Sequence, residues 1–192
     1  MRTMMIVLES LDGVGKSTVG PALAKRLNGA YIATPCGEYN EHRKMANGNN
    51  VARFFYYLSA VVSACDAIRE LLKKSVTVVV DRYIDSTVAT HQALGVDATN
   101  LIDEEQLDIV RPDYVFFLDL DNVERRRRLT SRPMSEYDKR LESDEALQLK
   151  TREFFLARKL TVLNVTSLSV AEEVDQIVAE ISRMEAAHAN RG

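Results

Sequence analysis

Cysteine is scarce in this chain of 192 residues, which contains only Cys36 and Cys65. The two cysteines have neither the Cys-x-x-Cys spacing nor the Cys/His pattern typical of zinc sites. A disulfide framework normally uses more cysteines than this. The composition therefore argues against both kinds of site and predicts two free thiols in a reducing compartment.

Long apolar runs and a strong charge imbalance are also missing. The first apolar run, residues 4–8, ends at Glu9 and is too short for a secretory signal, and no later stretch approaches a membrane span. The net charge of −3 is mild, and basic residues are spread along the chain except at 125–128. This argues against a general nucleic-acid-binding surface. We therefore expect a cytoplasmic protein with no nucleic-acid and no membrane partner.

Repeats, low-complexity tracts and linkers are absent as well, and the length fits a single domain, residues 1–192. Apolar patterning predicts strands at residues 4–8, 30–33, 76–80, 114–119 and 160–165. Helical spacing predicts helices at residues 16–27, 51–74, 85–94, 103–110, 122–130, 144–159 and 170–187. Alternating strands and helices indicate an α/β fold, in which helices cover both faces of a parallel sheet.

A glycine-rich turn follows the first predicted strand and precedes a predicted helix. Residues 10–18 read Ser-Leu-Asp-Gly-Val-Gly-Lys-Ser-Thr and match the phosphate-binding loop Gly-x-x-x-x-Gly-Lys-[Ser/Thr], except that Ser10 replaces the first glycine. Backbone N–H groups of such a loop surround a polyphosphate, and the helix dipole adds to the attraction. A chance glycine-rich turn is the alternative. We expect Lys16 to reach the terminal phosphates, Ser17 to ligate Mg²⁺, and a polyphosphate to be held by Asp12, Gly13, Val14, Gly15, Lys16, Ser17 and Thr18.

Asp81 and Arg82 end the third predicted strand. Carboxyl ends of parallel strands meet in one crevice, so this pair should lie near the glycine-rich loop. A carboxylate there suits a Mg²⁺ shell, although Asp81 could instead cap the following helix. The forked guanidinium of Arg82 suits an acceptor phosphate, unless it only pairs with Asp81 or Glu9. The arrangement is typical of phosphoryl transfer, which depends on positioning and charge neutralisation.

Four consecutive arginines, 125–128, precede a polar segment that contains the turn-prone pair Arg132-Pro133. Successive side chains point around more than half of a helix, so the four arginines cannot all contact one ligand. We expect most of them on a solvated face and up to two turned toward the crevice. Arg128 and Arg132 lie four residues apart and would share one side of a continuing helix. They are predicted to belong to a mobile lid, residues 128–140, that excludes water from the reaction.

Two further features have more than one interpretation. His91 lies on a predicted helix near Thr87, where a lone histidine more often makes a structural hydrogen bond than acts in catalysis. The run Phe54-Phe55-Tyr56-Tyr57 is more often core or subunit interface than a platform for base stacking. One of its rings could still contact an acceptor base.

The chain resembles the thymidylate kinase family of P-loop nucleoside monophosphate kinases in four segments. Residues 9–18 resemble the family's Glu-Gly-x-Asp-Gly-x-Gly-Lys-[Ser/Thr] loop, and residues 78–87 resemble its Asp-Arg-Tyr strand end. Residues 111–121 and 138–142 resemble the next strand and the segment after the lid. The resemblance spans nearly the whole chain. It implies a three-layer α/β/α sandwich with a five-stranded parallel sheet and a mobile lid.

The resemblance also implies an activity, namely transfer of the γ-phosphoryl group of ATP to a nucleotide with the help of Mg²⁺. It assigns the ATP phosphates to the glycine-rich loop, the adenine border to Thr166 and Leu168, and the lid arginines to Arg128 and Arg132. It places Asp12 near the acceptor's sugar, Asp81 in the Mg²⁺ shell and Arg82 on the acceptor phosphate. A homodimer through the long helix is implied as well.

The acceptor side departs from the family pattern. Ala33-Thr34-Pro35-Cys36-Gly37 stands where the bacterial family has Arg-Glu-Pro-Gly-Gly, so an arginine for the acceptor phosphate is missing. Counting back from Asp81 puts Ala60 where the family has an arginine for the thymine edge. Arg53 lies two helical turns away, so we do not expect it simply to substitute for that arginine. Thr90-His91-Gln92 replaces Tyr-Gln-Gly. The acceptor-binding candidates are Asp12, Thr34, Pro35, Phe55, Ser59, Ser63, Arg82, Tyr83, Thr87 and His91.

Three kinds of function follow from these residues. The first is phosphoryl transfer from ATP to a nucleotide, with thymidine monophosphate as the first acceptor to test. The second is a kinase for another nucleotide, a nucleoside or a different small acceptor, because an acceptor without a phosphate would explain the missing arginine. The third is an ATP-binding switch with slow turnover, although a pure binder does not need arginines at a lid. A degenerate relative that keeps the fold but transfers poorly is a further alternative.

Overall fold

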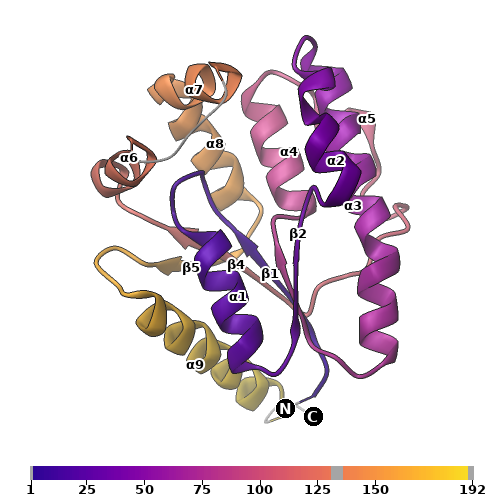
Figure 1. Cartoon of the computed structure of the whole chain (residues 1–192), viewed down its shortest axis with the longest axis vertical. Coiled ribbons are helices and arrows are strands. Elements are labelled where there is room, and N and C mark those ends of the chain that lie inside the picture. Colours follow the sequence, from indigo (N-terminus) through magenta and orange to yellow (C-terminus); the bar gives the residue numbers. More distant parts are fainter. Residues whose placement is uncertain (1, 131–135, 190–192) are drawn as a thin grey trace.

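The structure is a computed structural model that describes residues 2–130 and 136–189. Its sheet has five parallel strands in the order β2-β3-β1-β4-β5, with helices on both faces (Figure 1). This confirms the predicted α/β fold with a five-stranded parallel sheet. The strands are β1 (Met5–Glu9), β2 (Ala30–Ala33), β3 (Val78–Asp81), β4 (Tyr114–Asp119) and β5 (Thr161–Asn164).

The helices follow the strands in alternation. Described along the chain, they are α1 (Lys16–Arg26), α2 (Gly37–His42), the 3₁₀ helix η1 (Arg43–Ala46), α3 (Asn50–Lys73), α4 (Ile84–Ala93), α5 (Ala98–Leu101), α6 (Asn122–Thr130), α7 (Glu136–Ser143), α8 (Glu145–Ala157) and α9 (Val170–Ala189). Helices α2, η1, α5 and α7 were not expected from the sequence. The predicted lid is therefore partly helical, since α7 occupies its second half.

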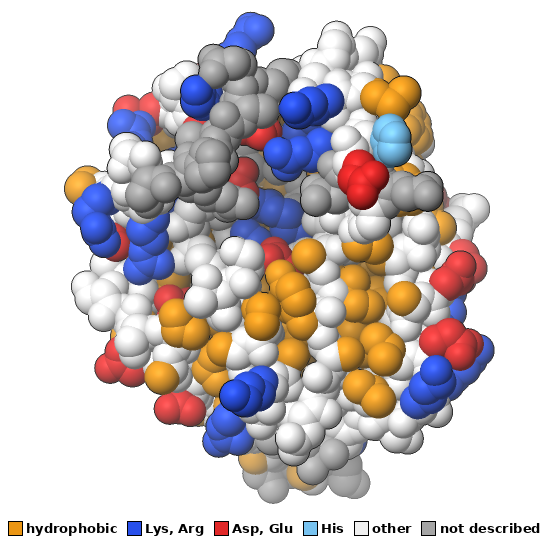
Figure 2. All heavy atoms as spheres, viewed as in Figure 1, with side chains coloured by type: hydrophobic (Ala, Val, Ile, Leu, Met, Phe, Trp, Pro, Cys, Tyr) orange, Lys and Arg blue, Asp and Glu red, His pale blue; other side chains and the backbone are white. Residues whose placement is uncertain are grey.

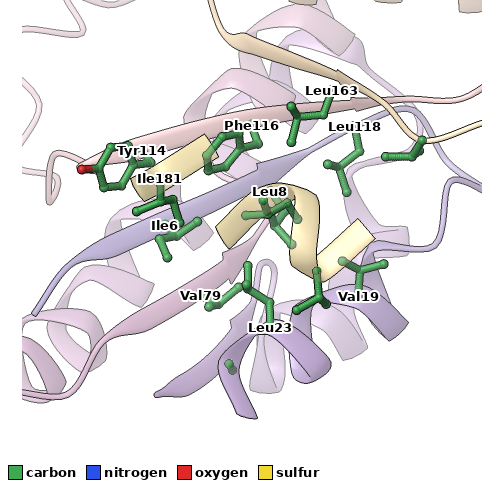
Figure 3. Packing of buried hydrophobic residues seen from close by; sticks show 14 of the residues in the cluster. Ile6, Leu8, Val19, Leu23, Val79, Tyr114, Phe116, Leu118, Leu163 and Ile181 are labelled. Atoms are coloured by element: carbon green, nitrogen blue, oxygen red, sulfur yellow. The ribbon is translucent and has the colours of Figure 1, made fainter. Parts of the chain in front are cut away.

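The central strand β1 divides the core into two halves. Ile6 and Leu8 pack toward α1 and α9, next to Leu23 and Ile181 (Figure 3). The alternate residues of β1 pack toward α3 and α4. All five side chains of β1 are buried because helices cover both faces, which explains its nearly continuous apolar sequence. Each buried apolar side chain of β1, from Met5 to Leu8, contributes about 1.5–3 kcal/mol to stability.

The helix predicted at residues 103–110 is wrong. The segment forms turns, and the preceding helix α5 ends at Leu101. The Asp103 side chain accepts a hydrogen bond from the backbone N–H of Glu105 at 3.0 Å, a local bond that competes with helix formation. Ile109 is buried and packs on the α3/α4 half of the core. The apolar residues of this segment thus cover the core from a loop.

Helix α3 is long and apolar enough, by length and composition, to cross a membrane, contrary to the expectation from the sequence. In its most apolar window, 44% of the residues are buried within the fold. Phe54, Val61 and Ile68 of α3 belong to the core cluster under the sheet. The apolar side chains of α3 that belong to this cluster therefore serve core packing.

The sheet register brings three loops together at the carboxyl ends of the strands. Leu8 of β1 lies opposite Asp81 of β3, and Ala33 of β2 lies opposite the same residue. The loops that leave β1, β2 and β3 therefore start side by side, as the topology of a parallel sheet requires. These loops contain the glycine-rich segment, Thr34-Pro35 and the turn at Arg82.

Candidate functional site

The glycine-rich loop wraps the N-terminus of α1. Gly13 and Gly15 have φ angles of 88° and 117°, in the left-handed region that favours glycine. A Cβ atom on Gly13 would lie only 2.7 Å from Cγ of Leu129 in α6. The buried ammonium of Lys16 donates a hydrogen bond to Oγ of Ser10 at 2.6 Å. The residue that departs from the loop motif is therefore a direct partner of its lysine.

Two cavities lie against this loop. Residues 12–18 all line the first, of about 430 Å³, which we call the donor cavity. The second, of about 340 Å³, extends toward α3, α4 and α8, and we call it the acceptor cavity. Figure 2 shows this face of the molecule hollowed near its centre, with Lys and Arg side chains inside the hollow. The two cavities share the side chains of Asp12, Ser17, Asp81 and Arg82.

Arg82 lies at this shared boundary. Its guanidinium pairs with the carboxylate of Asp12 and donates to Oγ of Ser86 at 3.2 Å. Burial opposes the charge, but Asp12, Asp81 and Glu9 together raise the pKa of Arg82 above its usual value, so it stays a cation. Its ion-pair partner is Asp12, whereas the sequence suggested Asp81 or Glu9. Its φ angle of 67° is uncommon for a residue other than glycine, a kind of strain that clusters at functional sites.

Glu9 holds the turn that contains Arg82, and the sequence analysis missed it as a site residue. Its fully buried carboxylate accepts from the backbone N–H groups of Tyr83 at 2.9 Å and Ser86 at 3.1 Å, and from the Ser86 hydroxyl. These N–H groups lie at the start of α4, where the helix itself offers no acceptor. Burial, together with nearby Asp85, raises the pKa of Glu9 to about 7. The signal in the sequence was a charged residue at the end of an apolar run.

Ser17 and Asp81 offer oxygen atoms suited to Mg²⁺. Asp81 is nearly buried and accepts a hydrogen bond from the Tyr31 hydroxyl at 3.0 Å. Residues 2–130 and 136–189 contain no group of three or more His, Cys, Asp or Glu side chains that could hold a metal. Mg²⁺ usually takes one or two protein oxygens together with phosphate oxygens and water. The pair therefore fits a Mg²⁺ ion shared with a phosphate, and does not resemble a site built from protein ligands alone.

The arginine run on α6 has one buried member. Arg125 is 1% exposed and donates to the backbone oxygen of Asp12 at 3.0 Å and to the Glu142 carboxylate at 2.7 Å. It thus joins the glycine-rich loop to α7. The expectation of a mainly solvated face overlooked this role, because side-chain direction on a helix depends on what packs against it. Leu129, four residues later and also buried, marks the same inward face.

Of the two predicted lid arginines, only Arg128 lies within the described residues. Arg128 lines the donor cavity and donates to the backbone oxygen of Val14 at 2.7 Å. It also pairs with Glu124 on its own helix. Arg132 lies outside the described residues.

Thr166 and Leu168 do not line the donor cavity. The Thr166 hydroxyl accepts a hydrogen bond from the backbone N–H of Asp121 at 3.0 Å, and Leu168 packs on the core. Val170 and Glu173, at the start of α9, line the donor cavity instead. The turn after β5 therefore brings slightly later residues to the cavity than the resemblance implied.

The acceptor cavity collects most of the acceptor candidates. Its lining includes Asp12, Thr34, Pro35, Arg82, Tyr83, Thr87 and His91. Phe55, Ser59 and Ser63 are corrections to the prediction, because they are exposed on the outer side of α3. The helical period explains this: residues spaced by four share a side, and the side that holds Arg53 and Tyr57 faces the cavity. Ala60, the position of the missing arginine, is buried.

Two arginines that the sequence analysis did not select line the acceptor cavity. Arg53 of α3 is buried, donates to the Tyr57 hydroxyl at 3.1 Å and lies over the Tyr57 ring at 4.8 Å from its centroid. Arg43 of η1 pairs with Asp138 of α7 at 3.2 Å. Together with Arg82, they give the cavity three guanidinium groups. Tyr57 was the available signal for Arg53, since the two lie one helical turn apart.

The position of Lys16 predicts a pH-dependent affinity for ATP. Burial, with a contribution from Arg82, lowers the pKa of Lys16 to about 8, so the ammonium loses its proton as the pH rises through about 8. ATP binding, measured by titration calorimetry, should weaken several-fold over this range. Lys16→Ala should bind weakly at every pH, and the exposed Lys25→Ala should behave as the wild type. The same pH dependence in Lys16→Ala would contradict the assignment.

The bonds of Glu9 predict a loss of stability on truncation. Glu9→Ala leaves the N–H groups of Tyr83 and Ser86 without their acceptor and should lower the free energy of unfolding by about 1–3 kcal/mol. Glu9→Gln keeps an acceptor oxygen and should lose less. Urea unfolding of the three proteins measures the difference. Equal losses in the two variants would show that the backbone acceptor is not the main contribution.

The buried pair between Arg125 and Glu142 predicts non-additive effects. Arg125→Met leaves the Glu142 carboxylate, only 10% exposed, without its guanidinium partner and should cost about 3–5 kcal/mol of stability. In the double variant Arg125→Met/Glu142→Met, both charges are gone, so much of the loss should be recovered. Unfolding experiments on both single variants and the double variant complete the cycle. Additive losses would exclude a direct contribution of the pair.

Comparison with known proteins agrees with this geometry. Residues 8–181 match the family model described as thymidylate kinase. A probable thymidylate kinase of Thermococcus kodakarensis is 32% identical over 93% of this chain and 95% of its own length. One of Methanocaldococcus jannaschii is 28% identical over 94% of this chain and 97% of its own length.

Solved structures show the same fold at lower identity. A thymidylate kinase from Candida albicans superposes with a TM-score of 0.75 at 20% identity, covering 96% of this chain and 93% of that one. A deoxyadenosine kinase from M. mycoides gives 0.69 at 18% identity, covering 94% of this chain and 100% of that one. The chain therefore belongs to the thymidylate kinase family and is a phosphotransferase, a nucleoside monophosphate kinase that acts on nucleotides.

Proposed function

We propose that this protein transfers the γ-phosphoryl group of ATP to a nucleoside monophosphate in a Mg²⁺-dependent reaction, with thymidine monophosphate as the first acceptor. The observation that supports this most directly is the boundary between the cavities, where Asp12, Ser17, Asp81 and Arg82 line both. Phosphoryl transfer needs a donor and an acceptor in line, with cationic groups around the transferred phosphoryl. Two cavities that meet at an arginine provide such an arrangement.

On the donor side, the backbone N–H groups of residues 13–18 bind the ATP phosphates. The Lys16 ammonium, already buried beside Ser10, neutralises charge on the terminal phosphates. Ser17 and Asp81 hold the Mg²⁺ ion, which when bound neutralises phosphate charge. Arg128 borders the same cavity, as do Val170 and Glu173 at the start of α9.

On the acceptor side, Arg82 binds the acceptor phosphate. Asp12 pairs with Arg82 and so orients its guanidinium, and Asp12 lies near the sugar of the acceptor. Ala33 stands where the family has an arginine after its second strand, and the next residue, Thr34, donates to the backbone oxygen of Arg82 at 2.7 Å. Arg43 supplies a guanidinium to the same cavity from η1. Positive charge for a phosphate is therefore present on the acceptor side, although it comes from a different part of the chain.

A nucleoside kinase is the second candidate. The observation that favours it is Ala33, an uncharged residue of the acceptor cavity at the position where the family places an arginine for the acceptor phosphate. The three arginines of the acceptor cavity favour the monophosphate. The same arginines argue against a slow ATP-binding switch, which has no need for charge around an acceptor.

Assembly and location also belong to the proposal. Val51, Phe55 and Val62 are exposed on the outer side of α3 and suit a homodimer contact through this helix. We further propose a cytoplasmic protein that uses small-molecule nucleotides and has no nucleic-acid or membrane partner. The mild net charge supports this part of the proposal.

The test is ADP formation from ATP and Mg²⁺ with a panel of nucleosides and nucleoside monophosphates. Thymidine monophosphate should stimulate ADP formation, and a chelator should stop it. Arg82→Ala should raise KM for the monophosphate at least roughly ten-fold, because a charged hydrogen bond to the phosphate is lost. The exposed Arg183→Ala is the matched control and should leave KM unchanged.

Two results would contradict the proposal. Stimulation by nucleosides but by no monophosphate would support the nucleoside kinase. ATP binding without stimulation by any acceptor would support the switch.

A further inference from the structure

His91 has one ring nitrogen that the fold uses and one that it does not. The residue is only 2% exposed, and its Nδ1 lies 2.7 Å from the backbone oxygen of Thr87. A carbonyl oxygen can only accept, so Nδ1 carries the hydrogen. Burial, with a smaller effect from Arg53, lowers the pKa of His91 to about 4, so the ring is neutral at pH 7. Nε2 therefore has a free lone pair and acts as an acceptor.

This acceptor has no partner within the fold. Nε2 of His91 is buried and makes no hydrogen bond to any residue that the structure describes. Buried polar atoms nearly always have a partner, and a ligand can supply it. The His91 side chain lines the acceptor cavity, and the rings of Phe54 and Tyr57 hold it, with centroids 5.6 and 5.9 Å away. A rigid acceptor on a cavity wall suits an N–H group of a bound molecule.

Arg53 adds a donor next to this acceptor. Its guanidinium lines the same cavity and contacts Tyr57, the ring that also contacts His91. A guanidinium only donates hydrogen bonds. A donor beside an acceptor matches a base edge on which an acceptor atom lies next to an N–H group. Thymine and uracil present this edge as C4=O with N3–H, and cytosine presents it as N3 with its N4 amino group.

We infer that Nε2 of His91 accepts a hydrogen bond from an N–H group on the base edge of the acceptor nucleotide, and thereby helps to determine which acceptors the enzyme uses. The inference rests on the proposed function, because it requires a nucleotide in the acceptor cavity. Arg53 contacts the neighbouring acceptor atom of the base. Together the two side chains take over base recognition that Ala60 cannot provide.

The experiment compares acceptors that differ at this N–H group. One pair is thymidine monophosphate and its N3-methyl analogue, and the other is deoxycytidine monophosphate and its N4,N4-dimethyl analogue. The wild type should discriminate against the analogue in its preferred pair. His91→Leu, which keeps the volume but removes the acceptor, should lose at least roughly ten-fold of this discrimination in kcat/KM. The pair that shows the effect tells whether the base is of the thymine or the cytosine type.

Two readouts separate recognition from a structural role. In His91→Leu, KM for the unmodified acceptor should rise, whereas kcat and KM for ATP stay near the wild-type values. His91→Gln retains an acceptor oxygen and should recover part of the discrimination. Gln92→Leu, a neighbour on α4 outside the cavity lining, should keep all of it. Thermal unfolding checks that the variants are folded. If His91→Leu does not fold, the discrimination measured for His91→Gln decides the test.

The outcomes are distinct. If an active wild type does not discriminate between an acceptor and its methylated analogue, the inference is overturned. It is also overturned if a folded His91 variant discriminates as well as the wild type. Either result leaves the proposed function standing. If no nucleoside monophosphate stimulates ADP formation by the wild type, the proposed function fails and the inference fails with it.

Discussion

The buried carboxylate of Glu9 is the constraint on which the rest of the site depends. It ends the central strand and accepts hydrogen bonds from the backbone of Tyr83 and from Ser86, in the turn that follows the neighbouring strand. These bonds attach the turn that carries Arg82 to the strand that carries the glycine-rich loop. The donor and acceptor cavities share a boundary because these two segments are held together. Such a buried charge is tolerated only because polar donors surround it.

Charge around this boundary is arranged unevenly. Lys16 is a buried cation and Arg82 a partly buried one, but burial lowers the pKa of Lys16, whereas Asp12, Asp81 and Glu9 raise that of Arg82. Arg82 is thus a permanent charge fixed by its neighbours. Lys16 is held mainly by the neutral Ser10 hydroxyl, so an anionic phosphate can still gain from meeting it. The serine that breaks the loop motif fits this role as a weak, neutral partner.

The acceptor side shows how one cavity can be lined from different parts of a chain. Ala33 and Ala60 stand where the family pattern has arginines, yet Arg43 and Arg53 line the acceptor cavity. The short helices between β2 and α3 make this possible, because they carry Arg43 over the carboxyl end of the sheet. A guanidinium that arrives from a different backbone position approaches its ligand at a different angle. In sequence, the glycine-rich loop departs from its motif only at Ser10, whereas the acceptor side lacks both arginines of the family pattern.

The sequence by itself determined the strands, the parallel sheet and the glycine-rich loop, because these depend on local pattern: apolar runs, glycine spacing and helix starts. It also placed Asp81 and Arg82 at the right strand end. The tertiary structure alone decided which side of α3 faces the cavity, that Arg125 is buried and not solvated, and that residues 103–110 form turns. Each of these depends on what packs against a segment from elsewhere in the chain. The unusual Ser10 in the loop was visible at once, but its contact with Lys16 required the fold.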